Sequence, residues 1–204
     1  MAAQNKTREH LLDVGERIVR NQGFSSAGLA EILSEAEVPK GSFYHYFSSK
    51  ESYGVALLER YFVRSVEDMR RILEQPNRST QQAILDYFSA WKQRIEDSDC
   101  RQGCFAVKLT AEVSDLSEPM RQTLMQGRQH MVRILAEHLD RAQCQPSELL
   151  AEALYALWCG ADLAARANHD HRSLLAALWL TQQCLEQKST HLLTSQHDSP
   201  TSRM

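Results

Sequence analysis

Apolar residues recur at helical spacing along most of this chain, and patterns typical of β-strands are almost absent. In the first such segment, residues 7 to 22, one helical face gathers Leu11, Leu12, Val14, Ile18 and Val19. Gly23 follows, in the position where glycine commonly ends a helix. The sequence therefore predicts an all-α protein.

Polar residues mark the starts of several later helices. Ser48 and Glu51 match a capping box, S-x-x-E, and predict a long helix that continues until Pro76. Further helix starts are expected after three other serines: Ser79, Ser117 and Ser147. The last 16 residues are polar, and we expect residues 189–204 to form a disordered tail.

Composition limits the classes of function. The 204 residues carry a net charge of −3, so no global basic field indicates nucleic acid, and any DNA contact must be local. Five cysteines without a CxxC pair, and a polar N-terminus, predict a cytoplasmic protein with reduced thiols. The apolar stretches are short or interrupted by charges, so we expect no membrane span. We also expect no cofactor and no metal.

The stretch EVPKGSFYHYFSSKE, residues 37–51, crowds aromatic rings, lysines, proline and glycine together. It follows a short apolar run at helix spacing, residues 29–33, and a break at SEAEV. Pro39 suits the first turn of a second short helix. Two short helices joined by a tight turn predict a helix-turn-helix within residues 1–50.

The second of these helices is then the recognition helix, with its first turn at the major groove. Gly41 lets the backbone approach DNA, and Lys40 and Ser42 can reach base edges or phosphate. Tyr44 and His45 can hydrogen-bond phosphates. On the opposite face, Phe43 and Phe47 should anchor the helix. The remaining predicted contacts are Lys6 and Lys50; Lys50 lies in the first turn of the following helix, whose N-terminal amides attract phosphate.

Charge alone does not support this surface. Residues 1–50 contain six Lys or Arg and six Asp or Glu, so their net charge is zero. DNA binding then requires that four basic residues share the contact face while the acidic residues lie elsewhere. These basic residues are Lys6, Arg8, Lys40 and Lys50.

The segment FSSAGLAEILSEAEVPKGSFYHYFSSKESYGVALLE resembles the N-terminal domain of the TetR family of transcriptional repressors, with the signature K-G-[ST]-[FL]-Y-x-[HY]-F followed by K-E. The resemblance implies a homodimer of nine-helix chains that binds operator DNA until an effector enters the second domain. Residues 51–188 would then form the helical effector-sensing and dimerisation domain. The sequence contains no Gly-rich phosphate loop, nucleophile elbow or carboxylate dyad, so we expect that the protein is not an enzyme.

Two later segments, RQGCFAVKLTAEVSDLSEPMR and ALYALWCGADLAAR, resemble the branch of the family that includes the repressor of N-ethylmaleimide reductase. That branch senses electrophiles and oxidants with a cysteine, and Cys104 matches it. A predicted helix N-terminus and Lys108 should both lower the pKa of this thiol. Cys100 could form a disulfide with it. Arg166 occupies the position of a lysine in the branch, where it can stabilise a thiolate but is a poor nucleophile.

Other interpretations remain open at this stage. Cys104 could be a small buried apolar residue. A reversible apolar or aromatic ligand could instead bind among Phe88, Trp91, Met125, Tyr155 and Trp158, although aromatic residues at helical spacing also form ordinary cores. A thiol- or metal-dependent enzyme is a third alternative, but the triplet His169-Asp170-His171 lacks the partner motif of a metal site.

The two C-terminal segments, about 147–166 and 172–188, are apolar around most of their helical circumference. A helix of this kind is buried on more than one side. Because a helix-turn-helix commonly binds DNA as a two-fold pair, we expect these segments to form a homodimer interface.

Overall fold

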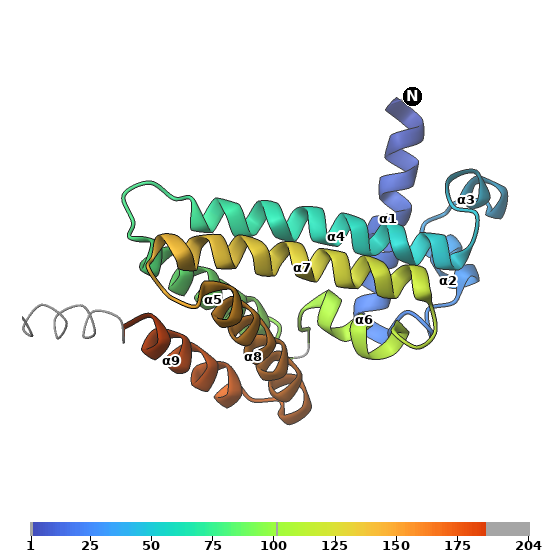
Figure 1. Cartoon of the computed structure of the whole chain (residues 1–204). Helices are drawn as coiled ribbons and strands as arrows, with labels where there is room; N and C mark the ends of the chain where they lie inside the picture. The colour runs from blue at the N-terminus through green and yellow to red at the C-terminus, as the bar shows by residue number, and fades with distance from the viewer. Residues whose placement is uncertain (1, 101, 187–204) are drawn as a thin grey trace, which may run out of the picture.

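The computed structural model describes residues 2–100 and 102–186 of the chain (Figure 1). Over these residues it forms helices and no strand, which confirms the all-α prediction. The helices are α1 Ala2–Gln22, α2 Leu29–Glu35, α3 Lys40–Tyr46, α4 Lys50–Leu73, α5 Thr80–Glu96, α6 Phe105–Val113, α7 Glu118–Arg141, α8 Ser147–Asn168 and α9 Arg172–Glu186. The predicted disordered tail, 189–204, lies outside the described residues.

The start of α4 differs by one residue from the predicted capping box. Ser49 is the N-cap: its hydroxyl accepts a hydrogen bond from the backbone N–H of Ser52, and the Ser52 hydroxyl accepts one from the N–H of Ser49, both at 3.0 Å. A serine thus takes the place of the acidic partner. Glu51 instead accepts a hydrogen bond from the hydroxyl of Ser117, 2.7 Å away.

The other predicted helix starts are mostly confirmed. Ser79 and Ser117 cap α5 and α7 through their hydroxyls. Ser147 is the first residue of α8 rather than its cap, since Pro146 precedes the helix. Pro39 likewise stands at the N-cap of α3, because the fixed φ of proline is compatible with the extended backbone just before a helix.

Two long helices, α4 and α7, run side by side through the molecule (Figure 1). At one end α1, α2 and α3 pack around the beginning of α4. At the other end α5 and α8 cover α7, and α9 packs on α5 and α8. The short α6 lies beside one end of α1 and also contacts α7 and α8, so it touches both halves of the molecule.

The outer surface of α8 and α9 is rich in exposed apolar side chains. Trp179 is 63% exposed and Leu149 is 70% exposed. The others are Leu163, Leu175 and Leu180. Within the described residues, no helix is both long and apolar enough to cross a membrane.

Candidate DNA-binding surface and thiol cavity

One face of α3, the predicted recognition helix, is anchored by an aromatic cluster. Phe43 is fully buried, with its ring centroid 5.2 Å from that of Phe47 and 5.3 Å from that of Tyr53. The hydroxyl of Tyr53 donates a hydrogen bond to the carbonyl of Leu11 at 2.6 Å, which ties α4 to α1. The prediction that Phe43 and Phe47 pack inward is confirmed.

The opposite face of α3 is open. Lys40, Gly41, Tyr44 and His45 are exposed, and Ser42 is half-buried. A Cβ added at Gly41 would meet nothing within 4 Å, so packing among the described residues does not require glycine at this position. Close approach to an external partner would explain it.

The two remaining predicted DNA contacts differ from each other. Lys6 is exposed on the first turns of α1. Lys50, at the start of α4, is half-buried: its ammonium donates to the carbonyl of Ser25 at 3.3 Å and lies 4.9 Å from the centroid of the Phe24 ring.

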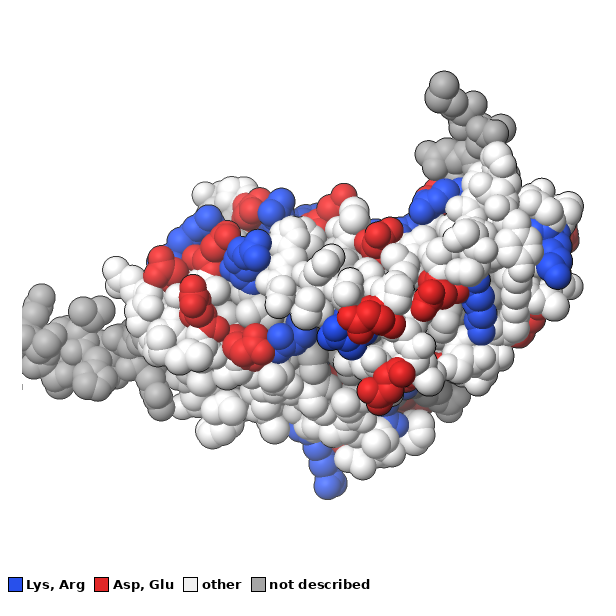
Figure 2. All heavy atoms as spheres, turned by 45° about the vertical axis from the view of Figure 1, so that its right-hand side comes forward, with Lys and Arg blue, Asp and Glu red and all other residues white. Residues whose placement is uncertain are grey.

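Many acidic side chains of the first helices form ion pairs with arginines. Arg60, whose side chain is 9% exposed, pairs with Glu9, Asp13 and Glu16. Arg17 pairs with Glu35 at 2.6 Å. These ion pairs neutralise acids near α1, whereas Lys6, Lys40 and Lys50 form no ion pair with other described residues. Figure 2, in which the side that carries α1, α2 and α3 comes forward, shows acidic and basic side chains interspersed, without one continuous basic area.

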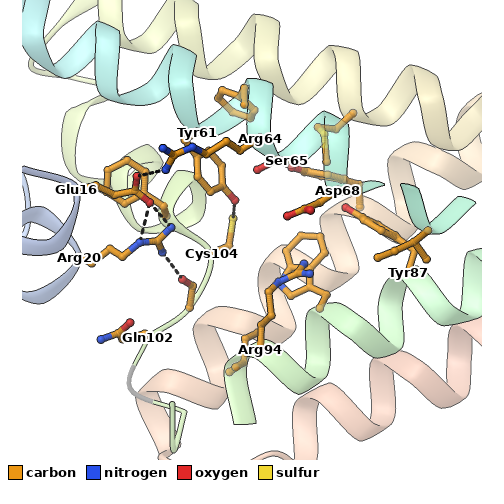
Figure 3. A pocket seen from close by; sticks show the side chains of 18 residues that line it. Glu16, Arg20, Tyr61, Arg64, Ser65, Asp68, Tyr87, Arg94, Gln102 and Cys104 are labelled. Atoms are coloured by element: carbon orange, nitrogen blue, oxygen red, sulfur yellow. Dashed lines mark hydrogen bonds and ion pairs between the residues drawn. The ribbon is translucent and has the colours of Figure 1, made fainter. Parts of the chain in front are cut away.

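A cavity of about 390 Å³ lies where α1, α4, α5, α7 and α8 meet the loop before α6 (Figure 3). We call it the thiol cavity. Its lining residues are Glu16, Arg20, Tyr61, Phe62, Arg64, Ser65, Asp68, Ile72, Tyr87, Trp91, Arg94, Ile95, Gln102, Gly103, Cys104, Phe105, Met131 and Tyr155.

Cys104 is the N-cap residue of α6 and is held at three points. Its N–H donates to Oδ2 of Asp162 at 2.7 Å, and its carbonyl accepts the N–H of Lys108 at 3.1 Å. Its sulfur is 3.0 Å from the hydroxyl of Tyr61 (Figure 3). The thiol therefore links α4 to the start of α6, while its backbone is fixed to α8.

The pKa of Cys104 is raised, so the predicted lowering is wrong. Burial is the main cause, and the Asp162 carboxylate adds to it. The Tyr61 hydroxyl and the amides of Ala106 and Val107 act in the opposite direction without prevailing. The helix N-terminus thus has the expected sign, but desolvation and a carboxylate from α8 outweigh it.

The Lys108 and Arg166 charges do not act on the thiol as expected. The ammonium of Lys108 donates to the carbonyls of Arg20 and Asn21. The Arg166 guanidinium lowers the pKa of Asp162, whose carboxyl nevertheless has a raised pKa because it is buried. Cys100 and Cys104 are both free thiols; Cys100 is buried and Cys104 is half-buried.

The predicted aromatic pocket divides into three parts. Trp91 and Tyr155 line the thiol cavity. Phe88 and Trp158 are fully buried and stack on each other with centroids 4.9 Å apart, so they are core residues. Met125 is 42% exposed on α7 and lines no part of the cavity. Helical spacing does not reveal which side of an aromatic residue a neighbouring helix covers.

Sequence reasoning missed most of the cavity lining, and it missed both side chains that hydrogen-bond Cys104, Tyr61 and Asp162. Asp162 is fully buried; it also accepts from the indole N–H of Trp91 at 3.3 Å, and its Oδ1 has no hydrogen-bond partner in the described structure. A carboxylate within the apolar segment of α8 was the available signal. Among the described residues, no cluster of three or more His, Cys, Asp or Glu side chains could hold a metal.

Comparison with known proteins gives this geometry a family. The HTH-type transcriptional repressor NemR of Escherichia coli K12 is 38% identical over 182 residues, 86% of this chain and 92% of NemR. Sequence models described as bacterial regulatory proteins of the tetR family and as a tetracyclin repressor-like C-terminal domain match residues 11–52 and 81–178. The chain belongs to the TetR family.

Solved TetR-family structures agree with this assignment. The crystal structure of the reduced form of E. coli NemR superposes with a TM-score of 0.80 at 38% identity, covering 87% of this chain and 96% of that one. The regulatory protein TetR of Rhodobacter sphaeroides gives 0.80 at 26% identity, covering 86% and 97%. The predicted family, fold and repressor class are confirmed. TetR-family repressors bind operator DNA and act as dimers.

Proposed function

We propose that this TetR-family repressor leaves its operator when Cys104 is covalently modified by an electrophile or an oxidant. The observation that carries the proposal is the position of the Cys104 sulfur, at the wall of the thiol cavity and 3.0 Å from the Tyr61 hydroxyl of α4. The cavity gives a small reagent space beside the sulfur. The relative NemR, whose solved structure is described as the reduced form, supports a thiol-based response.

The chemistry requires only the thiol and the reagent. With a maleimide, the thiol adds across the carbon–carbon double bond. The sulfur bonds to one alkene carbon, the S–H bond breaks, and the neighbouring carbon gains a proton. The thioether formed has no S–H to donate, and the added ring needs volume where Tyr61 now packs. The raised pKa lowers the thiolate fraction at neutral pH below that of an ordinary thiol, which slows its reaction with electrophiles.

DNA binding is assigned to residues 1–50, with α3 in the major groove. Lys40, Gly41, Ser42, Tyr44 and His45 form the contact set, and Lys6 and Lys50 face the flanking phosphates. The anchored inner face and open outer face of α3 support this assignment. Residues 51–188 then form the sensing and dimerisation domain.

Dimerisation is assigned to α8 and α9. Their exposed leucines and Trp179 form an apolar surface that a monomer would leave in water. A second copy of the chain buries it by two-fold symmetry, which also places two recognition helices for a palindromic operator. We assign the protein a regulatory role and no catalytic one; its relatives are transcriptional regulators.

The experiment is a gel shift on DNA that flanks the protein's own gene, with and without N-ethylmaleimide, for the wild type and Cys104→Ser. The proposal predicts release of the wild type and retention of the mutant. Cys184→Ser is the matched control, since this half-buried cysteine of α9 lies outside the thiol cavity. If the wild type and Cys104→Ser both stay bound to the DNA after N-ethylmaleimide treatment, the thiol trigger is contradicted.

That result would favour the second candidate, a reversibly bound aromatic ligand. The specific observation in its favour is the wall formed by Trp91 and Tyr155, with Arg94 also lining the cavity. A ligand of this class would quench tryptophan fluorescence. It would dissociate on dilution, whereas a covalent adduct would remain.

A further inference from the structure

Side chains of α6, whose N-cap residue is Cys104, bind the C-terminal end of α1 and the turn that follows it. Cys104, Lys108 and Glu112 follow one another at four-residue spacing, so they lie along one face of α6. The Lys108 ammonium donates to the carbonyls of Arg20 at 2.7 Å and Asn21 at 3.2 Å. These carbonyls belong to the last turn of α1, which has no partners for them within the helix. Lys108 therefore acts as a C-terminal cap supplied by another helix.

One turn further, Glu112 holds the connection between α1 and α2, residues 23–28. Its two carboxylate oxygens accept hydrogen bonds from the backbone N–H groups of Phe24 at 2.9 Å and Ser25 at 2.5 Å. Gly23 has φ +92°, and a Cβ there would lie 2.9 Å from the carboxylate. The close approach of Glu112 thus depends on glycine at this turn. We call these contacts of Lys108 and Glu112 the α6 clamp.

The clamped turn continues directly to the DNA-binding surface. The carbonyl of Ser25, whose N–H is bonded to Glu112, accepts a hydrogen bond from the ammonium of Lys50. The ring of Phe24 lies beneath the same ammonium and against Gly54 of α4, where an added Cβ would be 2.6 Å from it. Lys50 is one of the proposed phosphate contacts, so a single turn connects Glu112 to the DNA.

We propose that Lys108 and Glu112 are positioning residues that transmit the state of Cys104 to the helix-turn-helix. The inference rests on the proposed function, in which modification of Cys104 causes release. A group added to the sulfur disrupts its contact with Tyr61 and displaces the start of α6, while Glu112 lies about 12 Å along the same helix. Hydrogen bonds weaken steeply with small changes in length and angle, so a shift of about 1 Å opens the clamp.

The clamp predicts a specific change in affinity. Because modification of Cys104 already opens the clamp, its loss by mutation should weaken binding by the unmodified protein and leave the modified protein unaffected. Charge-assisted hydrogen bonds are stronger than neutral ones, and losing two of them should reduce operator affinity by at least about tenfold. A residue with a merely structural role would weaken both forms equally.

The test compares Glu112→Ala with Asp115→Ala, which removes an exposed acid just past the same helix. Operator affinity is measured by fluorescence anisotropy before and after N-ethylmaleimide treatment, with modification of Cys104 verified by mass spectrometry. Thermal unfolding is recorded in parallel, and Glu112→Gln, which keeps one acceptor oxygen, is a milder variant. Hydrogen exchange of residues 23–28 reports the clamp itself.

The expected result is that unmodified Glu112→Ala binds about tenfold more weakly than Asp115→Ala, the modified forms bind alike, and residues 23–28 exchange faster. Wild-type affinity in unmodified Glu112→Ala, or an equal loss in both forms, would overturn the clamp. If modified wild type keeps its affinity, the thiol trigger fails and the link to Cys104 fails with it. Slower exchange or tighter binding in Glu112→Ala would also refute the proposal.

Discussion

The carboxylate of Asp162 provides a direct test of how the cavity controls the Cys104 thiol. Asp162→Asn removes the negative charge and keeps a side-chain oxygen that can accept the N–H of Cys104, which Asp162 binds at 2.7 Å. Burial and the carboxylate both raise the pKa of Cys104, and the substitution removes only the second cause. We therefore expect a larger thiolate fraction at neutral pH.

The direction of the effect follows from the geometry. The carboxylate contacts the backbone of the residue that carries the sulfur, so its charge acts on the thiol at short range and with little solvent screening. Removing the charge therefore lowers the pKa of Cys104 and increases the thiolate fraction at neutral pH. Nucleophilicity falls as a thiol becomes more acidic, but by less than the thiolate fraction rises, so the alkylation rate should increase.

The assay measures the second-order rate of Cys104 alkylation by iodoacetamide at pH 7, by mass spectrometry of the modified peptide. Glu152→Gln, an exposed acid of α8 that pairs with Arg128, is the matched control and should react like the wild type. The sign also appears in the pH profile. Because its pKa is raised, the wild-type rate should keep rising with pH after an ordinary thiol has levelled off, and Asp162→Asn should level off earlier. An unchanged or slower rate in Asp162→Asn would refute the reasoning.

Three further predictions follow from the structure. Lys40→Ala should weaken operator binding and reduce its salt dependence by about one charge, with unchanged thermal unfolding, because the side chain is exposed; a lower melting temperature would contradict a role at the DNA. Gly103→Ala should destabilise the fold by about 1–3 kcal/mol in thermal or urea unfolding, since its Cβ would lie 1.9 Å from Oδ1 of Asp162; wild-type stability would refute this packing. Trp179→Glu should yield monomers in analytical ultracentrifugation, whereas Gln182→Glu on the same helix should remain dimeric, and a dimer in both would exclude this interface.

Much of the fold could be predicted because its signals are local. The spacing of Leu11, Leu12, Ile18 and their neighbours defines the buried face of α1, and Gly23 ends that helix at a positive φ. The inward packing of Phe43 and Phe47 follows from their separation by four residues. Within the candidate site, the open face of α3 and the position of Cys104 at a helix start were available in the same way, since each depends on a few consecutive residues.

The remainder depends on segments that meet only in the folded chain. The pKa of Cys104 is raised by burial and by Asp162, which is 58 residues away, so its direction could not be read from the neighbouring helix amides and Lys108. Lys108 itself turns to α1, 88 residues before it, and Glu112 reaches the turn after α1. Helical periodicity states which side of a helix is apolar but not which helix covers it. The sequence alone therefore determined the helices, the recognition element and the cysteine, whereas tertiary packing decided the ionisation of the thiol and its connection to the DNA-binding domain.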